Sequence, residues 1–368
     1  MREKIVCNKE NCEERKLSNR KRINSLQVLR VIAFLCVFAC HGGLSDSGAL
    51  GVSIFIILSG FLMFYSYSDR DISCSIKNNF LFTKKKIEKL YWLHIAMMFL
   101  VLLYSIKNLI VDFDRQLFRD EVINVVLHTL LIQSWIPFEK YYYSLNGVMW
   151  YLSTVTFFYF MSPYIIRYIK KIDSIKKTII LSIGIYIIQI LFIYYVNEIF
   201  LVNTGNKDVA TWLTYISPIF RLGDFIIGCN IGYLFVKCIT KRNFFIYSVL
   251  EVVSLLLIIG AQYIHNTMDI GYFKNTVLYT PVVVLVILLV SYGEGVISKI
   301  LTNKFLIYLG DISGYCYVIH QVVMAYVYTL FTKLNLGHNK LLHNTICIIF
   351  TVLAAIVWKK WGEKRENI

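Results

Sequence analysis

Two apolar runs joined by a short polar turn stand near the start of the chain. Residues 26–67 read LQVLRVIAFLCVFACHGGLSDSGALGVSIFIILSGFLMFYSY. The only basic or acidic residues in this stretch are Arg30, His41 and Asp46. A hydrocarbon core ~30 Å thick is crossed by about 20 apolar helical residues, so each run is long enough to span it. The stretch therefore predicts a membrane-embedded helical hairpin.

The same pattern continues along all 368 residues. Hydrophobic residues make up 57% of the chain and charged residues 17%, against roughly 45–50% and 25% in soluble domains. We therefore predict an all-α, polytopic membrane bundle of about ten transmembrane helices. The predicted spans are 26–43, 49–67, 90–106, 147–166, 178–197, 212–236, 244–264, 275–292, 312–332 and 343–358.

The distribution of basic residues predicts the orientation. If the N-terminus is cytoplasmic, 28 of the 38 lysines and arginines lie on the inner side and 8 on the outer side, as the positive-inside rule requires. This arrangement leaves residues 122–136 as an interfacial or re-entrant segment on the outer side. We expect a cytoplasmic tail at 1–24, a transmembrane domain at 25–358 and a second cytoplasmic tail at 359–368.

Charge and cysteine content exclude several function classes. The net charge of +15 would suggest nucleic acid in a soluble protein. Here the basic residues flank apolar runs, so we expect a lipid bilayer and no nucleic acid as partner. The nine cysteines form no CxxC motif, which gives no support to a zinc site. We expect no metal and no bound cofactor.

Arg30 and His41 are the first candidate site residues, because a charge at membrane depth is costly. They are eleven residues apart, which is close to three helical turns, so both would face nearly the same way about 16 Å apart along the axis. A fixed cation at the inner end and an imidazole at the outer end suit a long phosphorylated ligand. The alternative is a snorkelling arginine and an interfacial histidine.

Further candidates each have a structural alternative. The basic run 84–89 can bind phosphates or anionic lipid heads. Arg221 and Asp224, three residues apart, can form a structural ion pair or belong to a site. His320 is a second histidine inside the membrane. Ser59 belongs to a small-residue pattern that also serves helix packing, and Trp150 can belong to an interfacial aromatic belt.

Five groups of residues occur in an order that resembles the acyltransferase-3 family of integral membrane acyltransferases. The resemblance covers nearly the whole chain. The matching residues are Arg30 with His41, Gly51 to Phe61, Trp150 to Ser153 with Tyr159 and Pro163, Pro218 with Arg221, Phe225 and Gly228, and Leu309 to His320.

The resemblance implies a multi-pass enzyme of the bacterial cytoplasmic membrane. Such an enzyme moves an acyl group, usually acetyl, from cytoplasmic acyl-CoA to a hydroxyl of an envelope glycan or its undecaprenyl-linked precursor. The family's catalytic histidine corresponds to His41 and its arginine to Arg30. Lys86 and Lys89 are expected to help bind acyl-CoA. Ser59, Trp150, Arg221 and His320 are expected to orient substrates.

The sequence departs from the family pattern in three places. An Arg-x-x-Arg motif common in the family is replaced by Lys86 and Lys89, which keep the charge but lose bidentate phosphate recognition. Val155 and Thr156 stand where many members carry glutamate. Some members add a C-terminal esterase-like domain, which we do not expect here because the sequence ends ten residues after the last predicted span.

Other function classes remain open on sequence grounds. A transporter or flippase for a lipid-linked sugar would also have many spans and intramembrane charges. A glycan polymerase would be expected to carry a large outer loop, and the outer connections here are short. A non-enzymatic component of a polysaccharide export complex would show no turnover in isolation. The acceptor, the acyl group and the oligomeric state are not determined by the sequence.

Overall fold

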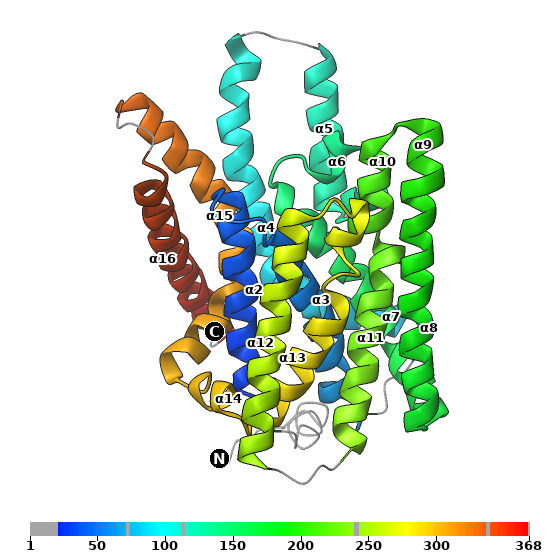
Figure 1. Ribbon diagram of the computed structural model, residues 1–368. Coiled ribbons are helices and arrows are strands. Elements are labelled where there is room, and N and C mark those ends of the chain that lie inside the picture. Colours follow the sequence, from blue (N-terminus) through cyan, green and yellow to red (C-terminus); the bar gives the residue numbers. More distant parts are fainter. Residues whose placement is uncertain (1–20, 71–73, 112–114, 239–242, 336–338, 367–368) are drawn as a thin grey trace, which may run out of the picture.

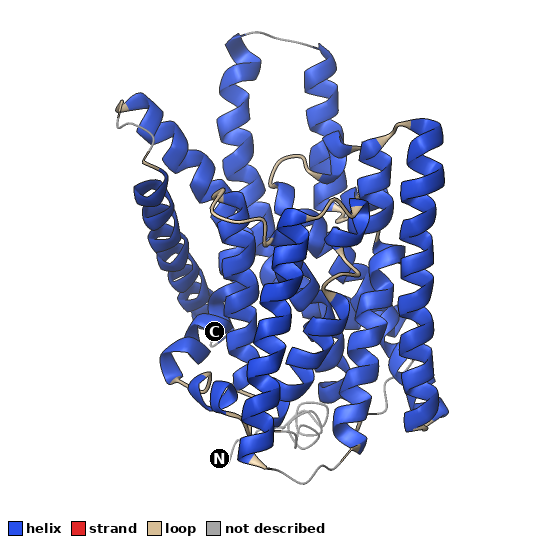
Figure 2. Ribbon diagram, viewed as in Figure 1, coloured by secondary structure: helices blue, strands red, loops and turns tan. Residues whose placement is uncertain are grey.

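The computed structural model is all-helical over the part of the chain that it describes, which is residues 21–70, 74–111, 115–238, 243–335 and 339–366 (Figures 1 and 2). The tail predicted at 1–24 therefore lies mostly outside the described residues. The α-helices are α2 (Ser25–His41), α3 (Gly48–Tyr67), α4 (Ile76–Val111), α5 (Arg115–Thr129), α6 (Glu139–Tyr142), α7 (Trp150–Ile172), α8 (Ile175–Tyr195), α9 (Leu201–Thr204), α10 (Lys207–Thr211), α11 (Pro218–Lys237), α12 (Phe244–Thr267), α13 (Thr280–Tyr292), α14 (Val296–Ile300), α15 (Lys304–Lys333) and α16 (Lys340–Glu366). Short 3-10 or π turns are η1 (Gln133–Trp135), η2 (Gly147–Met149), η3 (Val196–Phe200), η4 (Trp212–Ile216) and η5 (Gly271–Asn275).

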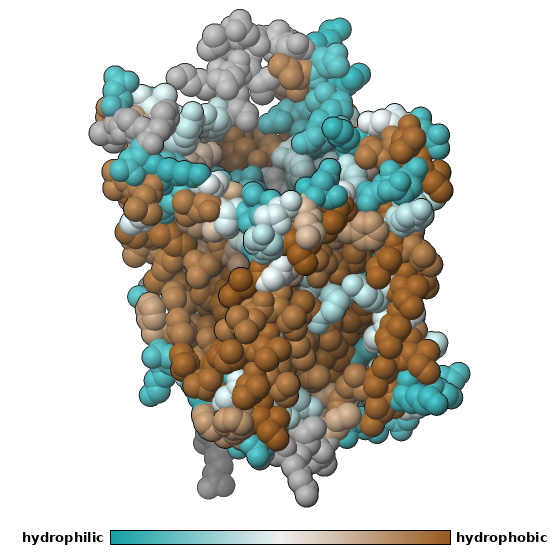
Figure 3. Space-filling model, in the orientation of Figure 1, coloured by the Kyte–Doolittle hydropathy of each residue, from teal (hydrophilic) through white to brown (hydrophobic). Residues whose placement is uncertain are grey.

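Seven helical segments among the described residues are long and apolar enough to cross a membrane. On the face drawn in Figure 3, a broad hydrophobic belt crosses the middle of the molecule, with polar residues gathered at both ends. These observations confirm an all-helical, polytopic architecture. Each of the ten predicted spans coincides with a helix, but α2 has only 17 residues, and α7 and α15 are not among the seven. The count of ten stays a prediction.

The segment 122–136 does not form one spanning helix. Helix α5 ends at Thr129 and is followed by the short turn η1. Leu131 has a φ of 55°, a left-handed conformation that a continuing α-helix cannot contain. Helices α4 and α5 project beyond the rest of the bundle at one end (Figure 1). The 36 residues of α4 correspond to about 54 Å, which exceeds the thickness of the hydrocarbon core.

Close contact between α3 and α11 forms the centre of the bundle. A Cβ atom added at Gly60 would meet the backbone carbonyl of Phe225, and one added at Gly228 would meet the backbone carbonyl of Ile57. The two glycines therefore let the helix backbones approach more closely than any larger residue would allow. This contact holds α3 in place beside α2, so that Ser59 and Phe55 face the interior cavities described below.

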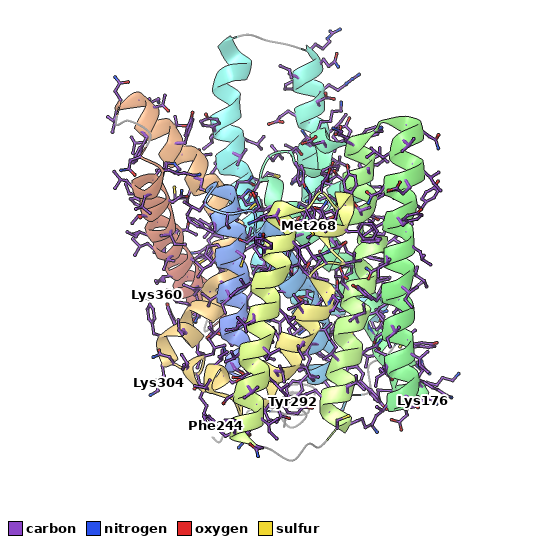
Figure 4. The ribbon with its side chains drawn as sticks, viewed as in Figure 1. Lys176, Phe244, Met268, Tyr292, Lys304 and Lys360 are labelled. Atoms are coloured by element: carbon purple, nitrogen blue, oxygen red, sulfur yellow. The ribbon has the colours of Figure 1, made fainter. Side chains whose placement is uncertain are left out.

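The two ends of the bundle differ in charge. We call the end that carries the start of α2 the basic face and the end that carries His41 the histidine face. Lys176 and Lys304 lie at the basic face, whereas Met268, which follows α12, lies at the histidine face (Figure 4). The predicted boundary at 358/359 falls inside α16, which continues to Glu366. The last residues described are therefore helical.

Candidate active site

His41 lies on the wall of a large cavity at the histidine face. The cavity has a volume of about 800 Å³. His41 is exposed, and no hydrogen bond of its ring is found within the described part of the chain. The cavity is lined mainly by polar and aromatic side chains, which include Asp46, Tyr143, Trp150, Tyr215, His265, Asn266, Lys274, Asn275, Tyr317 and Gln321.

His320 supports His41 from behind the cavity wall. The two ring centroids are 5.4 Å apart, and the ring planes are inclined at 52°. His320 is fully buried, and its Nδ1 donates to the carbonyl oxygen of Tyr317 at 2.7 Å. Because that carbonyl can only accept, Nδ1 carries the proton and the neutral ring keeps a lone pair on Nε2. No hydrogen-bond partner for this Nε2 is found among the described residues.

Two adjoining cavities open toward the basic face. Their volumes are about 310 Å³ and 270 Å³. Arg30, Ser59, Lys86 and Tyr159 line both of them, so the two cavities meet at these side chains. Lys89 lines the deeper cavity and Arg22 the shallower one. The structure therefore brings together three predicted donor-binding residues, Arg30, Lys86 and Lys89.

The charged side chains around these cavities are predominantly basic. Arg22 pairs with Asp311, which leaves this arginine partly neutralised. Arg30 donates from Nη1 to Gln27 Oε1 at 3.2 Å, and Lys86 Nζ lies 4.4 Å from the ring centroid of Tyr67. Neither contact neutralises charge, so Arg30 and Lys86 keep their attraction for an anion.

Arg30 and His41 do not share one cavity. Arg30 lines the two cavities toward the basic face, and His41 lines the large cavity at the histidine face. Tyr317 is on the wall of both the large cavity and the deeper basic one. The ligand path that the eleven-residue spacing suggested is therefore divided into two cavities, and Tyr317 of α15 lies between them.

The remaining predicted site residues occupy different positions. Ser59 lines both basic cavities, and Trp150 lines the large cavity. Arg221 lines none of the cavities described above. Its guanidinium is fully buried, and its Nη1 lies 3.0 Å from Asp224 Oδ2, which is the ion pair that their spacing allowed. Arg221 also lies 5.7 Å from the centre of the Tyr215 ring, so it borders the large cavity from behind.

Glu251 has a structural role. It is buried and accepts hydrogen bonds from the backbone N–H groups of Ile297 and Ser298, and from the Ser298 hydroxyl. The carboxylate therefore caps the first turn of α14 and ties this helix to α12. The sequence showed an isolated acidic residue in an apolar run and gave no indication of this partner.

Sequence reasoning missed several residues of the large cavity, including Asp46, His265, Lys274 and Gln321. They come from four separate segments of the chain and share no motif. Their polarity near the ends of apolar runs was visible, but their convergence on His41 depends on how α12, α15 and the loops pack. Tyr317 was visible only as a member of the motif 309–320.

Comparison with known proteins identifies the family. A model of the acyltransferase 3 family, described as an acyltransferase domain, matches residues 23–359. The chain belongs to the acyltransferase 3 family. The predicted family assignment and the enzyme class, an acyltransferase for groups other than aminoacyl, are thereby confirmed.

Two named relatives of this acyltransferase 3 protein are similar over most of their length. One is the acyltransferase MdmB of Streptomyces mycarofaciens, with 24% identity over 84% of this chain and 81% of the relative. The other is ORF330 of Acidianus two-tailed virus, provisionally named an acetyltransferase, with 27% identity over 75% of this chain and 73% of the relative. No solved structure matches the chain.

Proposed function

We propose that this protein is a membrane O-acyltransferase that moves an acyl group, in the first instance acetyl, from acyl-CoA to a hydroxyl of an acceptor in the large cavity. The observation that carries the proposal is the division of the interior. Basic side chains line the cavities at one face, and an accessible imidazole lines the cavity at the other. A soluble phosphorylated donor and a hydroxylated acceptor would thus enter from opposite ends.

The donor site follows from the charges. The phosphates of CoA are dianionic or monoanionic groups that bind best to charged donors in partly desolvated surroundings. Arg30, Lys86 and Lys89 provide such donors next to the apolar walls of Leu90 and Leu152. We assign the phosphates to the three basic residues and the pantetheine arm to the deeper cavity, with the thioester directed toward His41.

The acceptor site follows from the lining of the large cavity. Aromatic faces at Trp150 and Tyr215 alternate with hydrogen-bonding groups at Asn275 and Gln321. A few placed polar groups on an aromatic wall suit a ligand with many hydroxyls. We therefore propose an envelope glycan or its lipid-linked precursor as acceptor. The volume of about 800 Å³ accommodates a few sugar residues of such an acceptor and is too small to enclose a whole polymer.

His41 carries the chemistry in this proposal. Neutral imidazole accepts the proton of the acceptor hydroxyl while that oxygen attacks the thioester carbonyl. The C–S bond then breaks, and the CoA thiolate takes a proton to leave as the thiol. In a variant, the imidazole first takes the acyl group and passes it to the hydroxyl. A burst of free CoA in the absence of acceptor would indicate the variant.

The orientation is part of the proposal. We place both termini in the cytoplasm and ten helices across the bacterial cytoplasmic membrane. The basic face is then cytoplasmic, where acyl-CoA is made, and the histidine face is external. The gathering of lysines at the basic face supports this orientation through the positive-inside rule.

The test has two parts. The first measures the binding of acetyl-CoA to purified wild-type and His41→Ala protein in lipid nanodiscs. The second uses mass spectrometry to measure the acyl content of envelope glycan from cells that carry the intact gene, a deletion or the His41→Ala variant. We expect the deletion and His41→Ala to lose the same acyl mass from each repeat, while acetyl-CoA binding by the variant is retained. A glycan unchanged by deletion would refute the proposed acceptor. Full transfer activity in His41→Ala would refute the proposed base.

A further inference from the structure

One tyrosine separates the two parts of the proposed active site. Tyr317, on α15, is buried, with only 5% of its surface exposed. It lies on the wall of the His41 cavity and also on the wall of the deeper basic cavity. A thioester held by Arg30 and Lys86 has to pass this side chain to reach His41.

Tyr317 belongs to a layer of three aromatic rings. Its ring centroid lies 5.5 Å from that of Phe55 on α3 and 5.3 Å from that of Tyr151 on α7. Phe55 and Tyr151 are 5.8 Å from each other. The three rings thus contact one another pairwise and close the space between three helices. We call this set the aromatic layer.

Among the described residues, the side chain of Tyr317 makes one hydrogen bond. Its hydroxyl donates to the carbonyl oxygen of Val148 in η2 at 3.0 Å. The other contacts of the ring are edge or tilted contacts between aromatic faces. Rotation of the Tyr317 side chain to another rotamer can break these ring contacts. The backbone of α15 does not have to move for this change.

We propose that Tyr317 is the movable ring of the aromatic layer, closing the passage between the donor and His41 until an acceptor bound in the large cavity displaces it. This inference rests on the proposed function and deepens it, because it assigns the residue that admits the acyl group. In the closed state, water in the large cavity cannot reach the thioester in the basic cavity. Tyr317 is thus a specificity residue that favours transfer to a hydroxyl over hydrolysis.

The chemistry that the layer suppresses is simple. If the passage stays open, water replaces the acceptor hydroxyl. A bond forms between the water oxygen and the acyl carbon, the C–S bond breaks, one water proton goes to His41 and the thiolate is protonated. The products are the free acid and CoA. An open passage should therefore raise CoA release without acceptor, and this release should depend on His41.

The experiment measures free CoA by chromatography after purified protein is incubated with acetyl-CoA and no acceptor. Tyr317→Ala removes the ring, and Tyr317→Phe removes only the hydroxyl that holds it. We expect the release of free CoA to increase at least about fivefold for Tyr317→Ala. For Tyr317→Phe we expect an increase of about twofold to tenfold, the factor that corresponds to the net free energy of one hydrogen bond. The double variant His41→Ala with Tyr317→Ala should return to background.

Tyr186→Phe is the matched control. The Tyr186 hydroxyl also donates to a backbone carbonyl, that of Val277 at 3.1 Å, but Tyr186 lines none of the cavities described above. This variant should leave CoA release unchanged. Thermal unfolding is recorded for every variant, and Tyr317→Leu replaces Tyr317→Ala if the alanine variant does not fold.

The outcomes separate the two proposals. Unchanged or lower CoA release in folded Tyr317 variants that still bind acetyl-CoA would overturn the aromatic layer as a barrier and leave the proposed function intact. If the release of free CoA stays raised in the double variant, His41 takes no part in the hydrolysis. That result would overturn the proposed passage between the donor and His41. Wild-type protein that binds no acetyl-CoA would refute the proposed function itself.

Discussion

The imidazole rings of His41 and His320 lie with their centroids 5.4 Å apart, although the two residues come from α2 and α15, near opposite ends of the chain. His41 faces the large cavity, and His320 is fully buried behind it. This pairing gives the proposed base a buried neighbour that packs against one side of its ring. It also distinguishes the two histidines, because only the first is accessible to a substrate.

The first prediction concerns these two histidines. We expect His41→Ala to lower the rate of acyl transfer by about 10²- to 10⁴-fold, the usual contribution of a general base. His320→Phe keeps the ring volume and removes Nδ1 and Nε2, so it should lower the rate less than His41→Ala does. The transfer rate also falls as the pH is lowered, since protonated imidazole cannot accept a proton. Transfer is measured at saturating acetyl-CoA.

His343→Ala is the control for the histidine variants. His343 packs against Phe331, with ring centroids 5.5 Å apart, and lines none of the cavities described above. Its substitution should leave transfer unchanged. A larger loss in His320→Phe than in His41→Ala would contradict the assignment of roles.

The second prediction concerns the basic cavities. Arg30→Ala should raise the KM for acetyl-CoA about tenfold or more, because a hydrogen bond to a charged group contributes about 1.5–3 kcal/mol. Lys86→Ala and Lys89→Ala should have smaller effects in the same direction, since both side chains are exposed. Steady-state kinetics with varied acetyl-CoA provide the measurement.

Lys84→Ala serves as the matched control for that series. Lys84 lies in the same basic run and is exposed, but it lines neither basic cavity. If Lys84→Ala raises the KM as much as Lys86→Ala does, the basic run acts through its overall charge and not through a defined site.

The third prediction concerns the buried ion pair of Arg221 and Asp224. Both side chains are completely buried, and Asp224 Oδ1 accepts from Gln189 Nε2 at 3.3 Å. Arg221→Met or Asp224→Leu alone should destabilise the protein by about 3–5 kcal/mol, because each leaves an uncompensated buried charge. The double variant should be more stable than either single variant. Additive losses in denaturation experiments would show that the two residues do not act as a pair.

The fourth prediction concerns the glycines between α3 and α11. Gly60→Ala and Gly228→Ala should each destabilise the protein by about 1–3 kcal/mol, the usual effect of overpacking, because the new methyl group meets a backbone carbonyl of the other helix. Gly184→Ala and Gly260→Ala are the controls, because nothing lies within 4 Å of a Cβ at either position. Equal thermal shifts in all four variants would contradict the close approach.

The fifth prediction concerns pH and His128, which lies in α5 outside the spanning helices. Burial, with a smaller contribution from the nearby His94, lowers the pKa of His128 to about 3. The neutral folded form therefore binds fewer protons than the unfolded chain, whose histidine pKa is about 6.5. The stabilisation is present above about pH 6.5 and is lost progressively as the pH falls toward 3.

The measurement is the free energy of unfolding between pH 7 and pH 4 for wild type and His128→Leu. The slope for wild type should exceed that of the variant by up to about 1.4 kcal/mol per pH unit. Identical slopes for wild type and His128→Leu would mean that this ring does not remain neutral in the folded protein.

Much of the fold could be predicted from local sequence. Apolar runs of sufficient length specify helices wherever they occur, because a backbone inside lipid has to satisfy its own hydrogen bonds. An interfacial or re-entrant segment at 122–136 was predicted from the charge distribution, since a crossing there would have placed the basic loop 167–177 on the outer side. The position of the break at Leu131 was not. The pairing of Arg221 with Asp224 was one of the two alternatives that their spacing left open, because residues three apart on a helix are neighbours.

The composition of the site could be predicted only in part. Arg30, Lys86 and Lys89, which were predicted to bind acyl-CoA, all line the deeper basic cavity, and His41 lines the large cavity. The roles of these residues stay predictions. Spacing along α2 nevertheless suggested one continuous path, whereas Arg30 and His41 line separate cavities. Helical periodicity gives the direction of a side chain relative to its own axis and contains no information on what a neighbouring helix inserts between two such side chains.

The sequence by itself determined that this chain is a helical membrane protein of the acyltransferase 3 family, with a cation and an imidazole at opposite ends of its first apolar helix. Only the tertiary structure decided that His320 lies beside His41, that Glu251 caps α14 and that Tyr317 lies on the wall of both the large cavity and the deeper basic cavity. The reason is physical. Apolar runs and charges act on the residues that carry them, whereas these contacts join residues far apart in the chain and exist only after the helices have packed together.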